Sequence, residues 1–208
     1  AGRTEVVRAI IGADPRTGGK VFLNGKPLNC RTPHDAIVNG VVMVPEDRKL
    51  QGIIPRMSVG RNISIGSLDQ ITNRLGFVNT RREEQIGLEG KANFNIKTPD
   101  LEKPIVELSG GNQQKAIVAR WMSTKPEVLI LDEPTKGIDV GAKSEFYNMI
   151  CEFAKEGLAV ILISSELPEV IGLSDRIIVM RGRRIVGEIS AKDATEEKLL
   201  SMAMMEEA

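Results

Sequence analysis

The sequence predicts an α/β fold with a mostly parallel sheet, because short apolar runs alternate with helical patterns along the chain. Residues 128–131 read VLIL and residues 159–163 read AVILI, as expected of strands that are buried on both faces. Between these runs, apolar side chains recur with helical spacing and form one face, at Phe146, Met149, Ile150 and Phe153. Gly157 is expected to end this helix. Together these segments predict one β-α-β crossover.

The segments before this crossover predict a helix, a hairpin, a second helix and a strand, in that order. The first helix has an apolar face at Val6, Val7, Ile10 and Ile11. The hairpin covers residues 20–28 and turns at Asn24-Gly25, a pair of residues that tolerates positive φ. A short helix lies between Thr32 and Gly40, and the apolar run at 41–44 follows it as a third core strand.

The rest of the chain divides into a helical middle and a mixed C-terminal part. A second hairpin is expected over residues 176–188 and a final helix over residues 195–205. From residue 53 to residue 125 the strand signals fade, and polar helical patterns separated by loops replace them. We therefore expect an α/β core made of residues 1–52 and 126–208, with a helical subdomain inserted at 53–125.

Composition argues against several classes of protein. The 208 residues include 28 basic and 28 acidic ones, and this balance argues against a strongly basic nucleic-acid binder or a polybasic membrane anchor. We expect neither a membrane span nor a signal peptide, because no apolar run approaches the required ~20 residues. Cys30 and Cys151 form no C-x-x-C motif, which favours a reducing environment. The single histidine, His34, excludes any mechanism that needs a histidine elsewhere.

Two adjacent acids, Asp132 and Glu133, follow the apolar run at 128–131 in the sequence LDEPT. Ligands bind at the carboxyl ends of the strands in open α/β sheets. At this place Asp132 is expected to hold Mg²⁺ through water, and Glu133 to orient or deprotonate an attacking water. The alternative is a strand that ends in a polar turn, which the two acids alone do not exclude.

A serine and two glycines open a second distinctive segment, LSGGNQQK at 108–115. They begin a helix whose apolar face consists of Ile117, Val118, Trp121 and Met122. The free N–H groups and partial positive charge of a helix N-terminus attract anions, and glycines let an anion approach closely. The segment therefore predicts an anion-binding helix start at Ser109, Gly110 and Gly111, with an N-capped surface helix as the alternative.

Three motifs in this order resemble those of the nucleotide-binding subunits of ABC transporters. LSGGNQQK resembles the signature motif, VLILDEP at 128–134 resembles the Walker B strand with its catalytic glutamate, and GID at 137–139 resembles the D-loop. The likeness covers nearly the whole chain. It is greatest to the C-terminal domain of the fused double ATPase subunits of bacterial sugar importers of the ribose, galactose and xylose types. The resemblance implies a P-loop NTPase core that binds ATP and Mg²⁺ and hydrolyses ATP.

The resemblance also implies two sets of nucleotide-binding residues. The set offered to a second ATP-binding domain consists of Ser109, Gly110, Gly111, Gln113 and Asp139. The chain's own phosphate loop is represented by Gly2-Arg3-Thr4, in which arginine replaces the usual lysine and Thr4 binds the metal. Because the chain starts at Ala1, inside this loop, we expect a fragment that lacks the preceding strands and binds ATP weakly or not at all.

Two further positions depart from the family pattern. Glu46 stands where a glutamine is usual, and its carboxylate can bind the metal but repels phosphate. Ser165 stands at the switch position, where a histidine is usual. With Arg3, these departures predict a degenerate own site beside an intact signature motif, as in one unit of an asymmetric pair.

The function implied by the resemblance is that of an ABC-type ATPase that energises the import of a monosaccharide. Its partners would be a second ATP-binding domain in the same full-length chain, membrane permease subunits and, indirectly, a periplasmic sugar-binding protein, with no nucleic acid among them. It would act peripherally at the cytoplasmic face of the bacterial inner membrane. Two alternatives stay open: a catalytically inactive nucleotide-binding half, and a soluble ABC ATPase that acts on nucleic acid or ribosomes.

The permease contact is expected at the helical subdomain and at residues 46–52. Apolar residues just after this connection are candidates for the contact, namely Ile53, Ile54, Met57 and Val59. Packing inside the subdomain is the simpler use for most of them. The sequence does not identify the sugar, because the binding protein and the permease select it.

Overall fold

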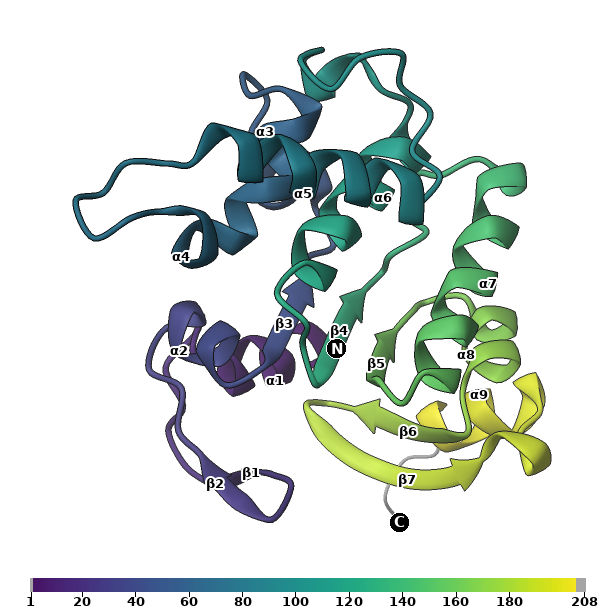
Figure 1. Ribbon diagram of the computed structural model, residues 1–208. Helices are drawn as coiled ribbons and strands as arrows, with labels where there is room; N and C mark the ends of the chain where they lie inside the picture. Colours follow the sequence, from purple (N-terminus) through teal and green to yellow (C-terminus); the bar gives the residue numbers. More distant parts are fainter. Residues whose placement is uncertain (1, 205–208) are drawn as a thin grey trace.

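The computed structural model describes residues 2–204. A small parallel sheet lies at its centre, with helices on both sides, a helical region above it and hairpins below it (Figure 1). The sheet is parallel, as predicted, and its strands follow the order β3-β4-β5. These strands are β3 (Val41–Val44), β4 (Val128–Asp132) and β5 (Ala159–Ile163).

Strand β4 lies between the other two strands and is buried on both faces, as its unbroken apolar sequence predicts. Leu129 and Leu131 belong to a core cluster with α6 and α7, whereas Ile130 belongs to a second cluster with α1 and α2. These helices are α1 (Arg3–Ile10), α2 (Pro33–Val38), α6 (Gly110–Met122) and α7 (Val140–Lys155). Because alternate side chains of β4 enter the two clusters, its carboxyl end is fixed from both sides.

Strand β5 differs from expectation, because the prediction that it is buried on both faces is wrong. Only Ile163 of this strand is buried, and Ile161 is 40% exposed. Among the strands of residues 2–204, β5 pairs with β4 alone, so it forms an edge of the sheet. The apolar sequence of β5 resembles that of β4, and composition does not distinguish an edge strand from a central one.

Two hairpins flank the core, as predicted. The first turns at Asn24 and Gly25, whose φ values are 49° and 75°. The first hairpin precedes the three core strands in the sequence. The second hairpin follows them and turns around Gly182. The remaining elements are β1 (Val21–Leu23), β2 (Lys26–Leu28), α8 (Leu167–Leu173), β6 (Arg176–Arg181), β7 (Arg184–Ser190), η4 (Ala191–Asp193) and α9 (Glu196–Met204). Met205, the last residue of the predicted final helix, lies outside the described residues.

The middle of the chain is helical, as the sequence predicts, and lies above the sheet in Figure 1. Before α6 it contains η1 (Arg48–Gly52), α3 (Val59–Ser64), η2 (Ile65–Ser67), α4 (Leu68–Ile71), α5 (Thr80–Asn93) and η3 (Ile105–Glu107). Its assignment as a separate subdomain at 53–125 stays a prediction. Within residues 2–204, no helix has the length and apolar character that crossing a bilayer requires.

A buried arginine joins three parts of this helical region. Arg120 of α6 donates hydrogen bonds to the carbonyl oxygen of Gly52 at 2.6 Å, and to the carbonyl oxygen and Oδ1 of Asn62 at 2.6 and 2.9 Å. Burial lowers the pKa of Arg120 to about 10. The guanidinium therefore fixes α6 to the end of η1 and to α3 through oxygen acceptors that carry no formal charge.

Candidate functional site

The carboxyl end of β4 carries the two predicted acids. Asp132 is fully buried, and neither carboxylate oxygen has a well-formed hydrogen bond within residues 2–204. Burial raises the pKa of Asp132, and the hydroxyl of Thr4 opposes this shift. The carboxylates of Glu46 and Glu133 raise the pKa further. A buried carboxylate with two unpaired oxygens fits a cation, which would satisfy both of them.

Glu133 is held by groups from two other segments of the chain, the start of α1 and the end of β5 with the turn that follows it. Its backbone has a φ of 48°, and its N–H donates to the carbonyl oxygen of Ile163 at 2.8 Å. Arg3 Nη2 lies 3.4 Å from Glu133 Oε1, and Ser165 Oγ donates to Glu133 Oε2 at 2.9 Å. The two carboxylate oxygens of Glu133 are thus engaged by the chain itself.

Arg3 connects the start of α1 to the turn after β5. In addition to its contact with Glu133, it donates through Nη1 to the carbonyl oxygen of Ser164 at 2.5 Å. Gly2 precedes α1 with a φ of 102°, and a Cβ at this position would approach Arg183 Cα to 2.9 Å, so the position requires glycine. The structure therefore brings together the predicted residues of the own site, which are Gly2, Arg3, Thr4, Asp132, Glu133 and Ser165.

Glu169 of α8 is a buried acid that the sequence interpretation missed. Its carboxylate accepts a hydrogen bond from Thr135 Oγ1 at 3.0 Å and another from Ser164 Oγ. Thr135 follows Glu133 closely and Ser164 precedes Ser165, so Glu169 joins the two turns that carry the site. The available signal was a glutamate shortly after two serines at a strand end, which is too weak to identify such a contact from sequence.

The predicted Glu46 lies just after β3 and contacts the segment that follows β4. Lys136 Nζ is 2.6 Å from Glu46 Oε1, and this hydrogen bond raises the pKa of Lys136. Arg48, which the sequence interpretation also missed, donates to the carbonyl oxygens of Lys136 and Gly137 at 2.9 and 3.1 Å. A Cβ on Gly110 would approach Arg48 Nη2 to 2.6 Å. Arg48 therefore links the segment after β3 to the start of α6.

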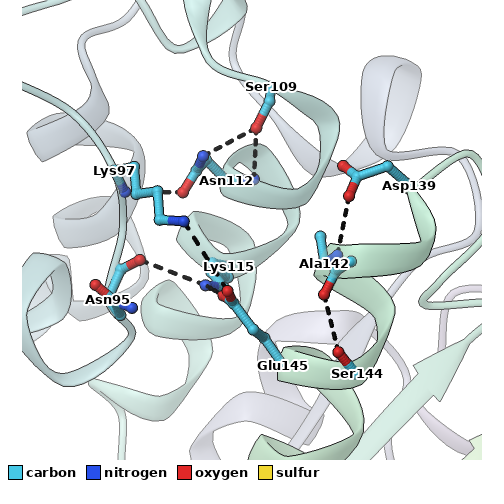
Figure 2. A network of polar contacts seen from close by, with 10 residues as sticks. Asn95, Lys97, Ser109, Asn112, Lys115, Asp139, Ala142, Ser144 and Glu145 are labelled. Carbon is cyan, nitrogen blue, oxygen red and sulfur yellow. Dashed lines mark hydrogen bonds and ion pairs between the residues drawn. The ribbon is translucent and has the colours of Figure 1, made fainter.

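A second group of predicted residues meets where α6 and α7 begin (Figure 2). Ser109 is exposed and caps α6, and Asp139 caps α7 by accepting a hydrogen bond from the N–H of Ala142 at 2.9 Å. A Cβ on Gly111 would lie 2.9 Å from the Cβ of Ala142, so this close approach of the two helices needs glycine. The structure therefore places Ser109, Gly110, Gly111 and Asp139 at one surface.

Gln113, which was also predicted to bind nucleotide, lies inside the molecule. Its side chain is buried, and Nε2 donates to the carbonyl oxygens of Leu108 and Ile105 at 3.0 and 3.4 Å. These contacts hold the turn that leads into α6. A contact between Gln113 and nucleotide would require this side chain to move. His34, the single histidine, is exposed in the first turn of α2.

Comparison with known proteins identifies close relatives of this chain. The family model described as "ABC transporter" matches residues 1–136. The arabinose import ATP-binding protein AraG of Mannheimia succiniciproducens is 53% identical over 207 residues, which make up 99% of this chain and 41% of that protein. A Rhizobium etli protein, provisionally named ribose/galactose/methyl galactoside import ATP-binding protein 1, is 49% identical over 98% of this chain and 38% of its own length. The chain thus spans about two fifths of these relatives.

Solved structures with a similar fold include the dimeric ATP-binding cassette MJ0796 in a post-hydrolysis state bound to ADP and Pi. Its TM-score is 0.74 at 18% identity, over 91% of this chain and 81% of that one. The structure of cbiO1 from Clostridium perfringens, part of an ABC transporter complex, gives a TM-score of 0.75 at 22% identity, over 96% and 76% of the two chains. These likenesses confirm the predicted α/β fold with a P-loop NTPase core. The family match, which covers residues 1–136 and so more than half of the chain, shows that this chain belongs to the ABC transporter family.

Proposed function

We propose that this chain is part of an ATPase that energises the import of a monosaccharide, acting together with a second ATP-binding domain. Support comes from the family match and from relatives about 50% identical that are named as import proteins for arabinose and for ribose or galactose. Its partners would be membrane permease subunits and, indirectly, a periplasmic sugar-binding protein. It would act at the cytoplasmic face of the bacterial inner membrane.

ATP and Mg²⁺ would be held at the carboxyl end of β4. Asp132 supplies a buried carboxylate with two unpaired oxygens, and Thr4 and Glu46 would add oxygen ligands beside it. Among residues 2–204 no three His, Cys, Asp or Glu side chains form a metal cluster. This suits Mg²⁺, which is held by one or two carboxylates together with phosphates. When bound, the ion neutralises charge on the phosphate oxygens.

The proposed asymmetry rests on one observation: Arg3 and Ser165 both contact the carboxylate of Glu133. These two contacts restrict the position of the Glu133 carboxylate and occupy part of the lone pairs with which it could take a proton from an attacking water. Arg3 must leave Glu133 to reach a phosphate, because one guanidinium cannot serve both at full strength. We infer that the chain's own site is degenerate at Arg3, Glu46 and Ser165 and hydrolyses ATP slowly.

The surface formed by Ser109, Gly110, Gly111 and Asp139, here called the signature surface, is open to solvent, unlike the site around Asp132 and Glu133. Ser109 is exposed, and the first N–H groups of α6 lie behind it at Gly110 and Gly111. Such a helix start binds the phosphates of a nucleotide well. We infer that this surface completes the nucleotide site of the second ATP-binding domain, with Asp139 beside it.

Two substitutions in the full-length protein, reconstituted with its permease, test this asymmetric arrangement. Ser109→Ala should lower the ATPase rate by about tenfold or more, because it removes a donor from the faster site. Glu133→Gln should lower the rate less than about threefold, because the slower site contributes little to the total. The exposed residues Ser201 and Glu84 offer matched controls as Ser201→Ala and Glu84→Gln. Equal losses from Ser109→Ala and Glu133→Gln would contradict the asymmetry, and no loss from either would contradict the roles proposed for both residues.

A catalytically inactive nucleotide-binding half is a second candidate, favoured by the same contacts on Glu133. The two candidates differ in what remains when the catalytic glutamate of the second domain is replaced by glutamine. A slow own site leaves ATP hydrolysis above background, and this residual rate disappears when Glu133→Gln is added. An inactive half leaves no hydrolysis before or after that addition.

A further inference from the structure

We propose that Asn112 is a positioning residue that directs the hydroxyl proton of Ser109 outward, so that this serine donates a hydrogen bond to an anionic oxygen. The inference deepens the proposed function, in which Ser109 meets the phosphates of a nucleotide held by a second domain. It concerns the start of α6, where Ser109, Asn112 and Lys97 lie next to one another (Figure 2).

The hydroxyl oxygen of Ser109 accepts two hydrogen bonds from Asn112. The side-chain Nδ2 donates at 2.9 Å, and the backbone N–H donates over a longer distance of 3.5 Å. A serine hydroxyl has one proton to donate and two lone pairs that can accept. Because Asn112 points donors at the lone pairs, the proton of Ser109 is directed away from Asn112. Ser109 is exposed, so its proton faces the open surface.

The orientation of the Asn112 amide is itself determined by the structure. Asn112 Oδ1 accepts a hydrogen bond from the backbone N–H of Lys97 at 2.8 Å. A backbone N–H only donates, so the amide oxygen has to face Lys97 and the amide nitrogen has to face Ser109. The donor and the acceptor are therefore fixed in both successive hydrogen bonds, from Lys97 to Asn112 and from Asn112 to Ser109.

The segment that carries Lys97 is in turn held against α6 and α7. Lys115 is buried, and its Nζ donates to the carbonyl oxygen of Asn95 at 3.4 Å and to Glu145 Oε2 at 2.5 Å. Lys97 Nζ lies 4.0 Å from Glu145 Oε1. Figure 2 shows these groups on one side of Asn112 and Ser109 at the open end of the same network. The support for Asn112 thus extends from α7 to the tip of α6.

This arrangement matters because a phosphate oxygen can only accept hydrogen bonds. A hydroxyl whose proton already points outward needs no reorientation when charge develops on the phosphate, and such preorganised donors contribute most to rate. A hydroxyl that rotates freely would spend part of its time with a lone pair facing the anion. Asn112 therefore acts on the rate of hydrolysis more than on the affinity for ATP.

The test uses the full-length protein with its permease and compares three substitutions of Asn112. Asn112→Leu has a similar shape and removes the donors, so kcat should fall by about three- to tenfold with KM for ATP changed less than about twofold. Asn112→Asp turns the donors into acceptors, so kcat should fall further than with leucine. Asn112→Gln keeps an amide and should recover activity relative to leucine. Asn148→Leu, at an exposed position on α7, is the matched control.

A double-mutant cycle with Ser109→Ala decides whether Asn112 acts through the hydroxyl. In the Ser109→Ala background, Asn112→Leu should lower kcat by less than about 1.5-fold, because the group that it orients is already gone. An unchanged effect of Asn112→Leu in that background would overturn the proposal, and so would equal kcat values for the aspartate and glutamine variants. If Ser109→Ala alone has no effect on the rate, the proposed function of this surface fails instead. Melting temperatures of all variants show that they fold.

Discussion

At the level of single residues, Asp132 lies where its charge lowers the stability of the fold. Its buried carboxylate has no well-formed hydrogen bond within residues 2–204, and burial raises its pKa. When the folded-state pKa of an acid is above the unfolded value, ionisation favours the unfolded chain. Asp132 therefore destabilises the fold at neutral pH, and this effect disappears below the unfolded pKa of about 4. We expect that a cation bound at Asp132 would offset this loss.

The substitution Asp132→Asn tests this placement in the absence of nucleotide and Mg²⁺. The amide carries no charge, so the free energy of unfolding should rise by about 1–3 kcal/mol at pH 7. The gain should shrink as the pH is lowered stepwise towards the unfolded pKa of about 4, because Asp132 is then neutral in the folded and in the unfolded chain. Urea unfolding at each pH measures it, with exposed Asp69→Asn as the control. A gain independent of pH, or a loss at pH 7, would contradict the account.

Glu169 has the opposite role, because its buried carboxylate is fully used inside the fold. Glu169→Leu would leave the hydroxyls of Thr135 and Ser164 without their acceptor, and should lower the free energy of unfolding by about 1–3 kcal/mol. Glu169→Gln keeps an acceptor and should lower it by less. Urea unfolding of the two variants is the measurement. Equal losses would show that the hydroxyl contacts contribute little.

Among the elements, the arrangement of α3, η1 and α6 depends on Arg120. Arg120→Met would remove a buried donor group and leave the oxygens of Gly52 and Asn62 unpaired, so stability should fall by about 2–4 kcal/mol. The exposed Arg81 on α5 provides the control, since Arg81→Met should change stability by less than about 0.5 kcal/mol. Chemical denaturation compares the two. Similar small effects of both substitutions would show that Arg120 does not hold these elements together.

The elements themselves were largely predictable from sequence, but many of their contacts were not. Strands β3 and β4 are recognisable because unbroken apolar runs leave no polar face, and the first hairpin is recognisable from Asn24-Gly25. The exposure of β5 was not predictable, because it depends on which strand lies at the edge. Arg48 and Glu169 were missed for a related reason. Their partners are distant in sequence, and no local pattern records a contact that only the tertiary fold creates.

In the whole molecule, the connection between the core and the helical region exposes one apolar side chain more than any of the residues expected to contact the permease. Ile53 is 7% exposed and Val59 is fully buried, so they pack inside, and Ile54 and Met57 are partly exposed, whereas Leu50 of η1 is 83% exposed. We expect Leu50 to contact a permease subunit. Leu50→Asp should therefore reduce transport in reconstituted vesicles by at least about tenfold, with the melting temperature unchanged. Unchanged transport would remove Leu50 from the contact, and Ile185→Asp, at an exposed residue on β7 outside the helical region, is the control.

We propose that the two nucleotide sites of the full-length protein are unequal: the site at Glu133 is slow, and the surface at Ser109 serves a faster site in a second domain. A single-turnover experiment on the full-length protein with its permease and labelled ATP tests it most directly. After both sites are loaded and free ATP is removed, about half of the bound nucleotide should convert quickly to ADP, and the rest should remain ATP for much longer than the fast half takes to react. Glu133→Gln should leave the fast half unchanged, and Ser109→Ala should abolish it. Conversion of all bound ATP at one rate would contradict the account.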